Sequence, residues 1–149
     1  MQTIHSVIVR TTPEAIWNVL ADVERWPTWT STMLHVEPLT PGALQVGSRY
    51  RVTQPKLRPG VYEVTDCTPH KALTWIQKVP GGTLVADHRF IAADSAGTEL
   101  ELSFATQGPL GGLLGRMYGK LIQEYIATEA RSLKSHCEAI AREANARLA

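Results

Sequence analysis

The C-terminal part of the sequence repeats apolar residues at a spacing that places them on one face of a helix. From residue 122 onward they recur in steps of four and three: Ile122, Ile126, Ala130, Leu133, Cys137, Ile140 and Ala144. These steps predict a helix of about thirty residues with one apolar stripe. Because a helix with a single apolar face buries it against another layer of structure, the rest of the chain has to supply that layer.

The middle of the chain has a different period. Between residues 33 and 107, short apolar or alternating segments are separated by breaks that carry Pro, Gly or Asp. In residues 98–107, Leu100, Leu102 and Phe104 share one face and polar residues the other. Alternation of this kind predicts antiparallel strands joined by turns. The predicted strands are residues 33–39, 48–54, 60–67, 73–79, 83–93 and 98–107.

The N-terminal segment predicts one more strand and two short helices. Residues 2–10 mix β-branched and polar residues as a strand does. Thr12 is a good N-cap, and Pro13 suits the first helical position. Asp22 is expected to cap a second, shorter helix that Pro27 interrupts. The predicted fold class is therefore α+β, a single domain over residues 1–149 in which a curved antiparallel sheet of about seven strands wraps around the long helix.

This arrangement predicts a cavity. Sheet and long helix are expected to close tightly at one end, while the two short helices hold them apart at the other. Space between layers that cannot collapse is where small ligands bind.

Composition excludes several other classes of protein. The net charge is +1, and the 15 basic residues are dispersed along the sequence, which argues against a dominant nucleic-acid or anionic-membrane footprint. No signal peptide or spanning segment is recognisable, so we expect no stable membrane insertion and a cytoplasmic location. Cys67 and Cys137 fit no metal or redox spacing and are interpreted as buried thiols. No metal site and no cofactor are predicted, and both a monomer and a homodimer remain open.

Three segments and the terminal helix carry a resemblance to a known family. They are TTPEAIWNVLADVERWPTW (11–29), VGSRYRV (46–52) and DHRFIAADSAGTELELSF (87–104), and the helix follows a Gly-rich stretch. In these features the chain resembles the START-like, or helix-grip (SRPBCC), superfamily, specifically the small bacterial polyketide cyclase/dehydrase-like proteins. The resemblance covers nearly the whole chain and implies the helix-grip fold. Relatives include cyclases, hydrolases, lipid and hormone carriers and quinone-binding proteins, so it does not fix one function.

The resemblance also implies a place for the WPTW segment, beside the mouth of the cavity. Trp26 would then cover the end of the core, and Trp29 would lean toward the opening. The alternative is that both indoles plug the gap between the sheet and the helices, because aromatic side chains bury much area wherever they lie.

His88 is the polar residue with the clearest chemical potential. Alternation in residues 83–93 puts His88 on the same face as Leu84, Ala86 and Phe90, toward the predicted cavity. A histidine there can act as a general acid or base, or orient a ligand. The alternative is a core histidine whose ring nitrogens bond to a backbone or tyrosine partner, and the lack of an identifiable second catalytic group favours it.

The same alternation, with the first turns of the long helix, nominates a mostly apolar set with a few amides and hydroxyls. That composition suits a flat hydrophobic ligand held by one or two hydrogen bonds, although a filled core has the same pattern. The candidate ligand-binding residues are Trp29, Tyr50, Gln54, Tyr62, Trp75, Gln77, His88, Phe90, Phe104, Leu114, Met117, Tyr118, Leu121 and Tyr125.

The Gly-rich stretch GPLGGLLG (108–115) matches neither a phosphate loop nor a dinucleotide fingerprint. We expect a pliable start to the long helix, with Leu110, Leu113 and Leu114 as an apolar flap, or simply a tight corner.

Two functions follow as hypotheses. The first is binding of a small hydrophobic or aromatic molecule of lipid, quinone or polyketide type. The second is a polyketide cyclase or dehydratase activity in which His88 transfers protons and Tyr62, Tyr50 or Tyr118 orients a carbonyl group. Paired-carboxylate chemistry has little support in the sequence. A third, weaker possibility is a protein that docks a partner on an exposed face.

Overall fold

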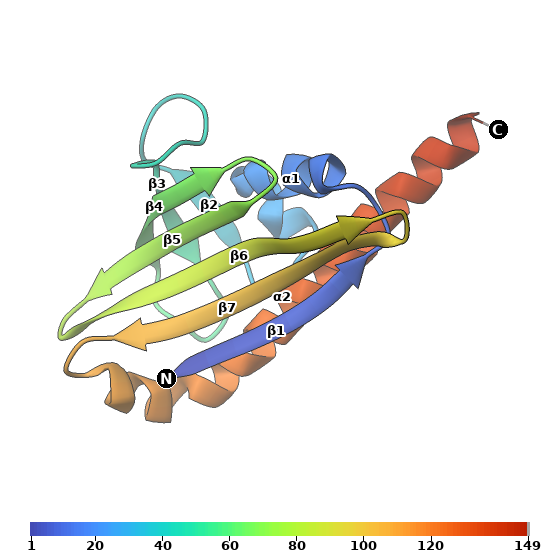
Figure 1. The fold of residues 1–149 in the computed structure, drawn as a ribbon. Helices are drawn as coiled ribbons and strands as arrows, with labels where there is room; N and C mark the ends of the chain where they lie inside the picture. The colour runs from blue at the N-terminus through green and yellow to red at the C-terminus, as the bar shows by residue number, and fades with distance from the viewer. Residues whose placement is uncertain (149) are drawn as a thin grey trace.

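The computed structural model describes residues 1–148 and has one sheet, two α-helices and one 3₁₀ helix (Figure 1). The strands are β1 (Gln2–Val9), β2 (His35–Pro38), β3 (Arg49–Thr53), β4 (Gly60–Thr68), β5 (Ala72–Val79), β6 (Gly82–Asp94) and β7 (Gly97–Gln107). The helices are α1 (Pro13–Ala21), the 3₁₀ helix η1 (Val23–Thr28) and α2 (Gly111–Leu148). This confirms the predicted α+β fold.

Strands β2 to β7 form an antiparallel meander, and β1 pairs with β7 at the edge of the sheet. Its order is β1-β7-β6-β5-β4-β3-β2, and every neighbouring pair is antiparallel. Irregularities at Val64/Asp66 in β4 and at Phe90/Ala92 in β6 interrupt the ladder. Bulges of this kind increase twist and bend a sheet, so they help it to curve around α2.

The short helices form largely as their sequence predicts. The Thr12 hydroxyl accepts a hydrogen bond from the Ala15 amide at 3.3 Å, and Pro13 occupies the first helical turn. The second helix is a 3₁₀ helix that contains Pro27, and the Asp22 side chain makes no capping hydrogen bond to it, contrary to expectation.

Helix α2 is longer than predicted, with 38 residues, and it begins inside the Gly-rich stretch. Gly111, Gly115 and Gly119 lie four residues apart and face the sheet side, where added Cβ atoms would lie 3.2 Å from the Thr106 carbonyl oxygen, 2.5 Å from the Met1 Cβ and 3.5 Å from the Met1 sulfur. The glycines thus allow the helix to approach the sheet closely. The Gly-rich stretch forms the start of α2, as expected, while its pliability and the leucine flap remain predictions.

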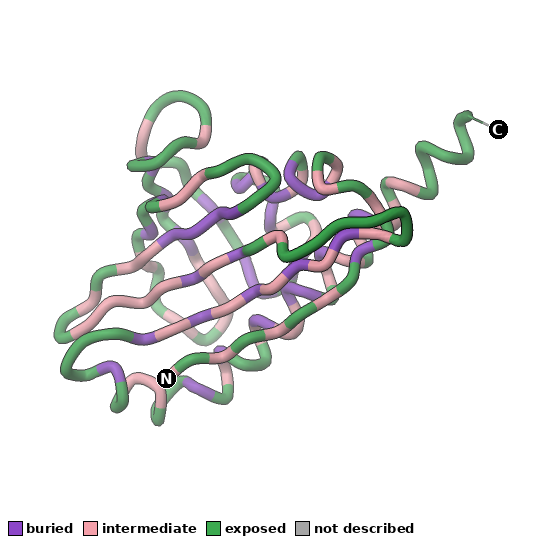
Figure 2. The backbone as a smooth tube through the Cα atoms, viewed as in Figure 1, coloured by how far each residue is buried: buried purple, intermediate pink, exposed green. Residues whose placement is uncertain are grey.

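The apolar stripe of α2 is buried from Ile122 to Cys137, but Ile140 and Ala144 are exposed. The reason is geometric, because the last turns of α2 extend beyond the sheet and have nothing to pack against (Figures 1 and 2). Cys137 is buried and Cys67 is half-buried, and both are free thiols. Burial raises the pKa of Cys137 to about 12, and the charge of Glu138 adds to that effect.

Candidate functional site

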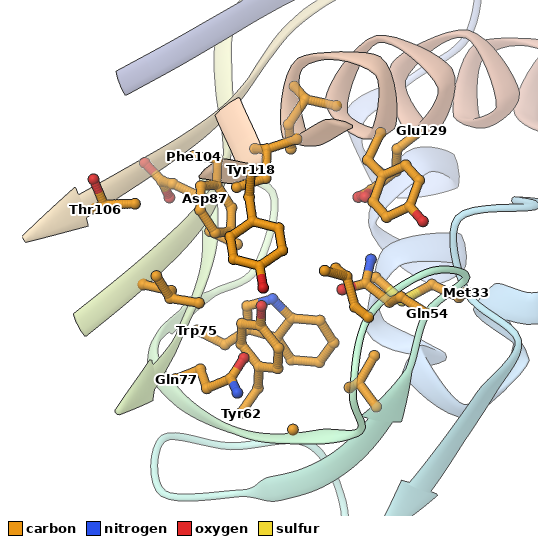
Figure 3. Close-up of a pocket in the computed structure, with 18 of the residues that line it drawn as sticks. Met33, Gln54, Tyr62, Trp75, Gln77, Asp87, Phe104, Thr106, Tyr118 and Glu129 are labelled. Atoms are coloured by element: carbon orange, nitrogen blue, oxygen red, sulfur yellow. The ribbon is translucent and has the colours of Figure 1, made fainter. Parts of the chain in front are cut away.

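A cavity of about 210 Å³ lies between the concave face of the sheet and α2 (Figure 3). Alternate residues of four neighbouring strands form its floor: Tyr62 of β4, Trp75 and Gln77 of β5, Leu84, Ala86 and His88 of β6, and Phe104 and Thr106 of β7. Side chains from successive turns of α2 form its roof: Leu114, Tyr118, Ile122, Tyr125, Ile126 and Glu129. The period of two on the strands and of about four on the helix therefore turns both sets toward the same space.

A buried pair of ionisable residues, His88 and Glu129, closes one end of the cavity. His88 Nε2 lies 2.7 Å from Glu129 Oε1, and the two residues are only 4% and 5% exposed. The other ring nitrogen, Nδ1, lies 3.1 Å from the Leu73 carbonyl oxygen. Since a carbonyl can only accept, Nδ1 carries a hydrogen and donates it.

The remaining proton of this pair sits between the imidazole and the carboxyl group. Burial by itself lowers the pKa of His88, but the hydrogen bond to Glu129, the charge of Glu129, the Leu73 carbonyl and the charge of Asp87 together raise it above the ordinary value. His88 is thereby favoured as an imidazolium that donates both of its N–H groups, one to Leu73 and one to Glu129. The second carboxyl oxygen of Glu129 has no hydrogen-bond partner within residues 1–148, and Glu129 is among the residues that line the cavity.

The tryptophan Trp26 completes the closed end. It is fully buried, and its indole N–H donates to the Leu20 carbonyl oxygen at 3.0 Å. Its ring lies 5.0 Å from that of Trp75 and 5.2 Å from that of His88, measured between centroids. The short helices therefore close the cavity here, contrary to the expectation that they hold it open.

Tyr62 supplies a hydroxyl beside this pair. Its ring packs on Trp75 with centroids 4.9 Å apart, and burial, followed by the charge of Glu129, raises the pKa of Tyr62 strongly. The hydroxyl therefore keeps its proton at any ordinary pH. No protein partner accepts or donates a hydrogen bond to it in the described part of the chain, so it is free to donate to a ligand.

The opposite end is the mouth. The lining residues there are only partly covered: Leu57 and Arg58 from the β3–β4 turn, and Leu114 and Tyr118 from the first turns of α2. The Tyr125 hydroxyl donates to the Pro55 carbonyl oxygen and ties α2 to that turn. In Figure 3, Tyr118 points from α2 into the cavity, toward Trp75 and Tyr62.

Most candidate residues from the sequence do line this cavity. They are Gln54, Tyr62, Trp75, Gln77, His88, Phe104, Leu114, Tyr118 and Tyr125. The structure places them together around one space. The amide of Gln54 is already engaged, donating to the Thr32 carbonyl oxygen at 3.1 Å.

Five candidates do not line the cavity, and four of them lie on strands or helix turns next to it. Tyr50 is buried in the core next to Trp75, and Phe90 packs on Trp17 with centroids 6.2 Å apart. Met117 is 63% exposed, and Leu121 is beside the lining stripe of α2 but outside it. Alternation identified the correct face of each strand, but it does not say how far along the strand the cavity extends.

Trp29, the fifth, lies outside the cavity. Its ring stacks on His136 at 6.3 Å, in a shallow surface groove between α1, η1 and α2. Trp26 stands between Trp29 and the cavity, with 5.7 Å between the two ring centroids. WPTW therefore does not border the mouth, as the resemblance implied, because this segment packs at the closed end. The alternative interpretation, in which both indoles plug the gap between the sheet and the helices, agrees with this packing.

Sequence reasoning missed Glu129, the charged residue most deeply placed in the cavity. A signal was available, because Glu129 comes three residues after Ile126 and four before Leu133 and thus interrupts the apolar stripe. A carboxylate on the buried face of a helix is costly unless it is paired, and such a position indicates a partner across the interface. Arg58 was missed because turn residues have no alternation to follow.

Comparisons with known proteins agree with this architecture. The family model described as "Polyketide cyclase / dehydrase and lipid transport" matches residues 1–138. No curated protein matches the sequence. Within residues 1–148, no helix is long and apolar enough to cross a bilayer.

Solved structures of similar fold include three informative examples. The Zhui aromatase/cyclase from Streptomyces sp. R1128 is 18% identical with a TM-score of 0.78, and the match covers 97% of each chain. A protein from Thermus thermophilus is 15% identical with a TM-score of 0.75, over 94% of this chain and 99% of that one. The di-domain ARO/CYC BexL from the BE-7585A biosynthetic pathway is 16% identical with a TM-score of 0.70, over 95% of this chain and 47% of that one. At these identities the likeness concerns the fold alone.

Proposed function

The chain belongs to the polyketide cyclase/dehydrase and lipid transport family, and we propose that it binds a small hydrophobic molecule with at least one aromatic ring in the cavity described above. The observation that carries this proposal is the lining, in which the rings of Trp75, Phe104 and Tyr118, together with aliphatic side chains, give the cavity a mainly apolar surface. An apolar cavity of roughly 150 Å³ is enough to take up benzene, so about 210 Å³ suits one or two fused rings.

The polar groups give the ligand an orientation. The Tyr62 hydroxyl and the Gln77 amide face the cavity from adjacent strands, and neither has a protein partner in the described residues. A ligand carbonyl or hydroxyl group that accepts from Tyr62 would place its ring against Trp75. This is the pattern of an apolar site with a few directed hydrogen bonds.

The experiment is a thermal-shift titration that uses 2-naphthol, menadione and palmitate as probes. Aromatic probes are expected to raise the Tm of the wild type by mass action, more than palmitate does. Ala86→Phe fills the cavity from β6 and should abolish the shift, whereas Ala92→Phe, on an exposed position of the same strand, should leave it intact. Equal shifts in both variants, or no shift with any probe, contradict the proposal.

A second candidate function, cyclase- or dehydratase-type catalysis, is favoured by the His88–Glu129 pair. Because both N–H groups of His88 are already donated, the reactive group would be the free oxygen of Glu129. It would accept a proton from the carbon between two ligand carbonyl groups while Tyr62 donates to the developing enolate oxygen. After the enolate carbon attacks a second carbonyl group of the same molecule, Glu129 would return the proton to the new alkoxide. His88 would then be a positioning residue that holds the carboxyl group of Glu129 in place through the 2.7 Å contact.

Turnover of a synthetic poly-β-ketone thioester, followed by chromatography, separates the two candidates. An enzyme of this type should lose turnover in Glu129→Gln and in Tyr62→Phe while still binding 2-naphthol in the Glu129→Gln variant. A protein that only binds its ligand should show no turnover in the wild type, and the variants should change affinity alone.

A further inference from the structure

The segments around the mouth of the cavity carry several positive charges and no negative ones. Residues 54–60, 78–84 and 106–121 meet there: Leu110 donates its N–H to the Gly81 carbonyl oxygen, and the Tyr125 hydroxyl reaches Pro55. Together these segments contain five cations and no carboxylate: Lys56, Arg58, Lys78, Arg116 and Lys120. All five are exposed, and none forms an ion pair within residues 1–148.

This concentration of charge corrects the impression given by the sequence. The cations are dispersed along the chain, which argued against an anionic-membrane footprint, but the fold brings three separate turns to one end. In Figure 1 the β5–β6 turn and the start of α2 lie together at this end of the molecule. Positive charge that is gathered in space attracts an anionic surface whatever its spacing in the sequence.

Exposed apolar side chains accompany the cations. Leu110, Leu113, Met117 and Tyr118 are 44%, 52%, 63% and 37% exposed, within nine consecutive residues. On α2, Leu113, Arg116, Met117 and Lys120 follow the spacing i, i+3, i+4, i+7 and so share one side of the helix. That side borders the turn of α2 from which Leu114 and Tyr118 line the mouth.

Two exposed apolar residues on β1 lack this setting. Ile4 and Ile8 lie on the outer face of β1, at 52% and 60% exposure, and Ile8 pairs in register with Glu99. The negative charge of Glu99 would repel an anionic surface that approached Ile8. Apolar residues and unopposed cations therefore coincide at the mouth and not on this outer face.

We propose that the first turns of α2, with the turns around Arg58 and Lys78, dock the protein reversibly on an anionic lipid bilayer. Leu113 and Met117 enter the boundary between headgroups and acyl chains, and the five cations lie at the level of the lipid phosphates. The cavity mouth then faces the bilayer, so that a hydrophobic ligand passes between membrane and cavity without crossing water. The docking itself does not depend on the proposed function, but this role in ligand transfer rests on it.

A bilayer fits this surface better than an acidic protein does. The side chains of Leu113 and Met117 are exposed and lie on the same side of α2 as Arg116 and Lys120. Interfaces between proteins rely on anchors buried in pockets, whereas a lipid interface accepts isolated apolar tips flanked by cations.

Flotation with lipid vesicles tests the docking without any ligand. The probes are vesicles of phosphatidylcholine alone and vesicles with about a third of phosphatidylglycerol. The wild type is expected to float with the anionic vesicles only, and about 0.5 M salt should release it. Leu113→Ser with Met117→Ser should lower the bound fraction at least about tenfold, and so should Arg116→Gln with Lys120→Gln.

Two matched variants serve as controls. Arg142→Gln with Arg147→Gln removes the same charge from the exposed far end of α2, and Ile4→Ser with Ile8→Ser removes two exposed apolar residues from β1. Both should bind vesicles as the wild type does. Circular dichroism melting curves check that each variant is folded.

The docking proposal is overturned if the wild type ignores anionic vesicles, binds neutral ones equally well, or is released as strongly by the control substitutions as by those at the mouth. Failure with vesicles would leave an acidic protein as the partner for these cations. Because 2-naphthol binding is measured in solution without lipid, failure of docking and failure of the proposed ligand site are seen separately.

Discussion

His88 and Glu129 are 41 residues apart in the chain, yet Nε2 of one lies 2.7 Å from Oε1 of the other in the closed end of the cavity. The contact joins β6 to α2 across the site, and both partners are almost completely buried. A buried pair of this kind shares one proton, and its net charge of zero lowers the cost of burying it. The pair is thus a structural link between sheet and helix that also holds a proton at the wall of the cavity.

The energetic coupling of this pair can be measured in a double-mutant cycle. His88→Leu leaves a carboxylate buried without its partner and should lower the free energy of unfolding by about 3–5 kcal/mol at pH 7. Glu129→Leu leaves a histidine that can become neutral, so we expect a smaller loss of about 1–3 kcal/mol. The double variant should be more stable than His88→Leu alone. Urea denaturation gives all three values, and simple additivity would argue against the pair.

The stability of the protein should depend on pH through His88. The folded-state pKa of His88 is raised by Glu129 above its unfolded value near 6.5. A raised pKa means that the folded state binds the proton more tightly, so this stabilisation is complete below about pH 6.5 and is lost as the pH rises through the folded pKa. Tm values between about pH 6 and 9 should therefore fall in the wild type.

Glu129→Gln is the control for this pH dependence. Without the carboxylate, burial dominates and lowers the pKa of His88, so the stability contribution should change sign and be lost toward acid instead. A Tm profile identical to that of the wild type would show that another group is responsible. NMR titration of the His88 ring gives the pKa directly.

The two tryptophans Trp29 and Trp75 should behave differently in ligand binding. Trp75→Leu removes a wall of the cavity and is expected to weaken binding of 2-naphthol about tenfold or more. Trp29→Leu removes a ring that stacks on His136 outside the cavity, so it should lower stability and leave affinity within about twofold. Isothermal titration calorimetry gives the affinity of both variants for 2-naphthol. Equal losses of affinity would contradict the placement of Trp29 outside the binding site.

Two glycines near the mouth should respond oppositely to alanine. Gly112 lies in the first turn of α2 with nothing within 4 Å of an added Cβ, so Gly112→Ala should raise the free energy of unfolding by about 0.5–1 kcal/mol. Gly81 has a φ of +79°, and an added Cβ would lie 2.4 Å from Leu110 Cδ1. Gly81→Ala should therefore destabilise by about 1 kcal/mol or more. Thermal melts distinguish the two, and a stabilising Gly81→Ala would contradict this account.

Local patterns in the sequence were enough to predict the helices and strands and the faces that they bury. Steps of three and four between Ile122 and Cys137 set the buried side of α2, and alternation put His88 and Trp75 on the concave face of the sheet. Thr12 and Pro13 marked the start of α1. These signals are readable because each depends on residues only a few positions apart, whose spacing the local backbone geometry converts directly into direction.

The extent of the cavity and the contacts inside it could not be predicted from local patterns, because they depend on the packing of distant segments. Trp29 and Phe90 have the same local signals as residues that line the cavity, but packing puts Trp26 and Trp17 beside them instead. The pairing of His88 with Glu129, and the gathering of Arg58, Lys78 and Arg116 at the mouth, join residues from separate elements. Such contacts depend on strand register and on how far α2 slides along the sheet, and both are set by the packing of the whole core.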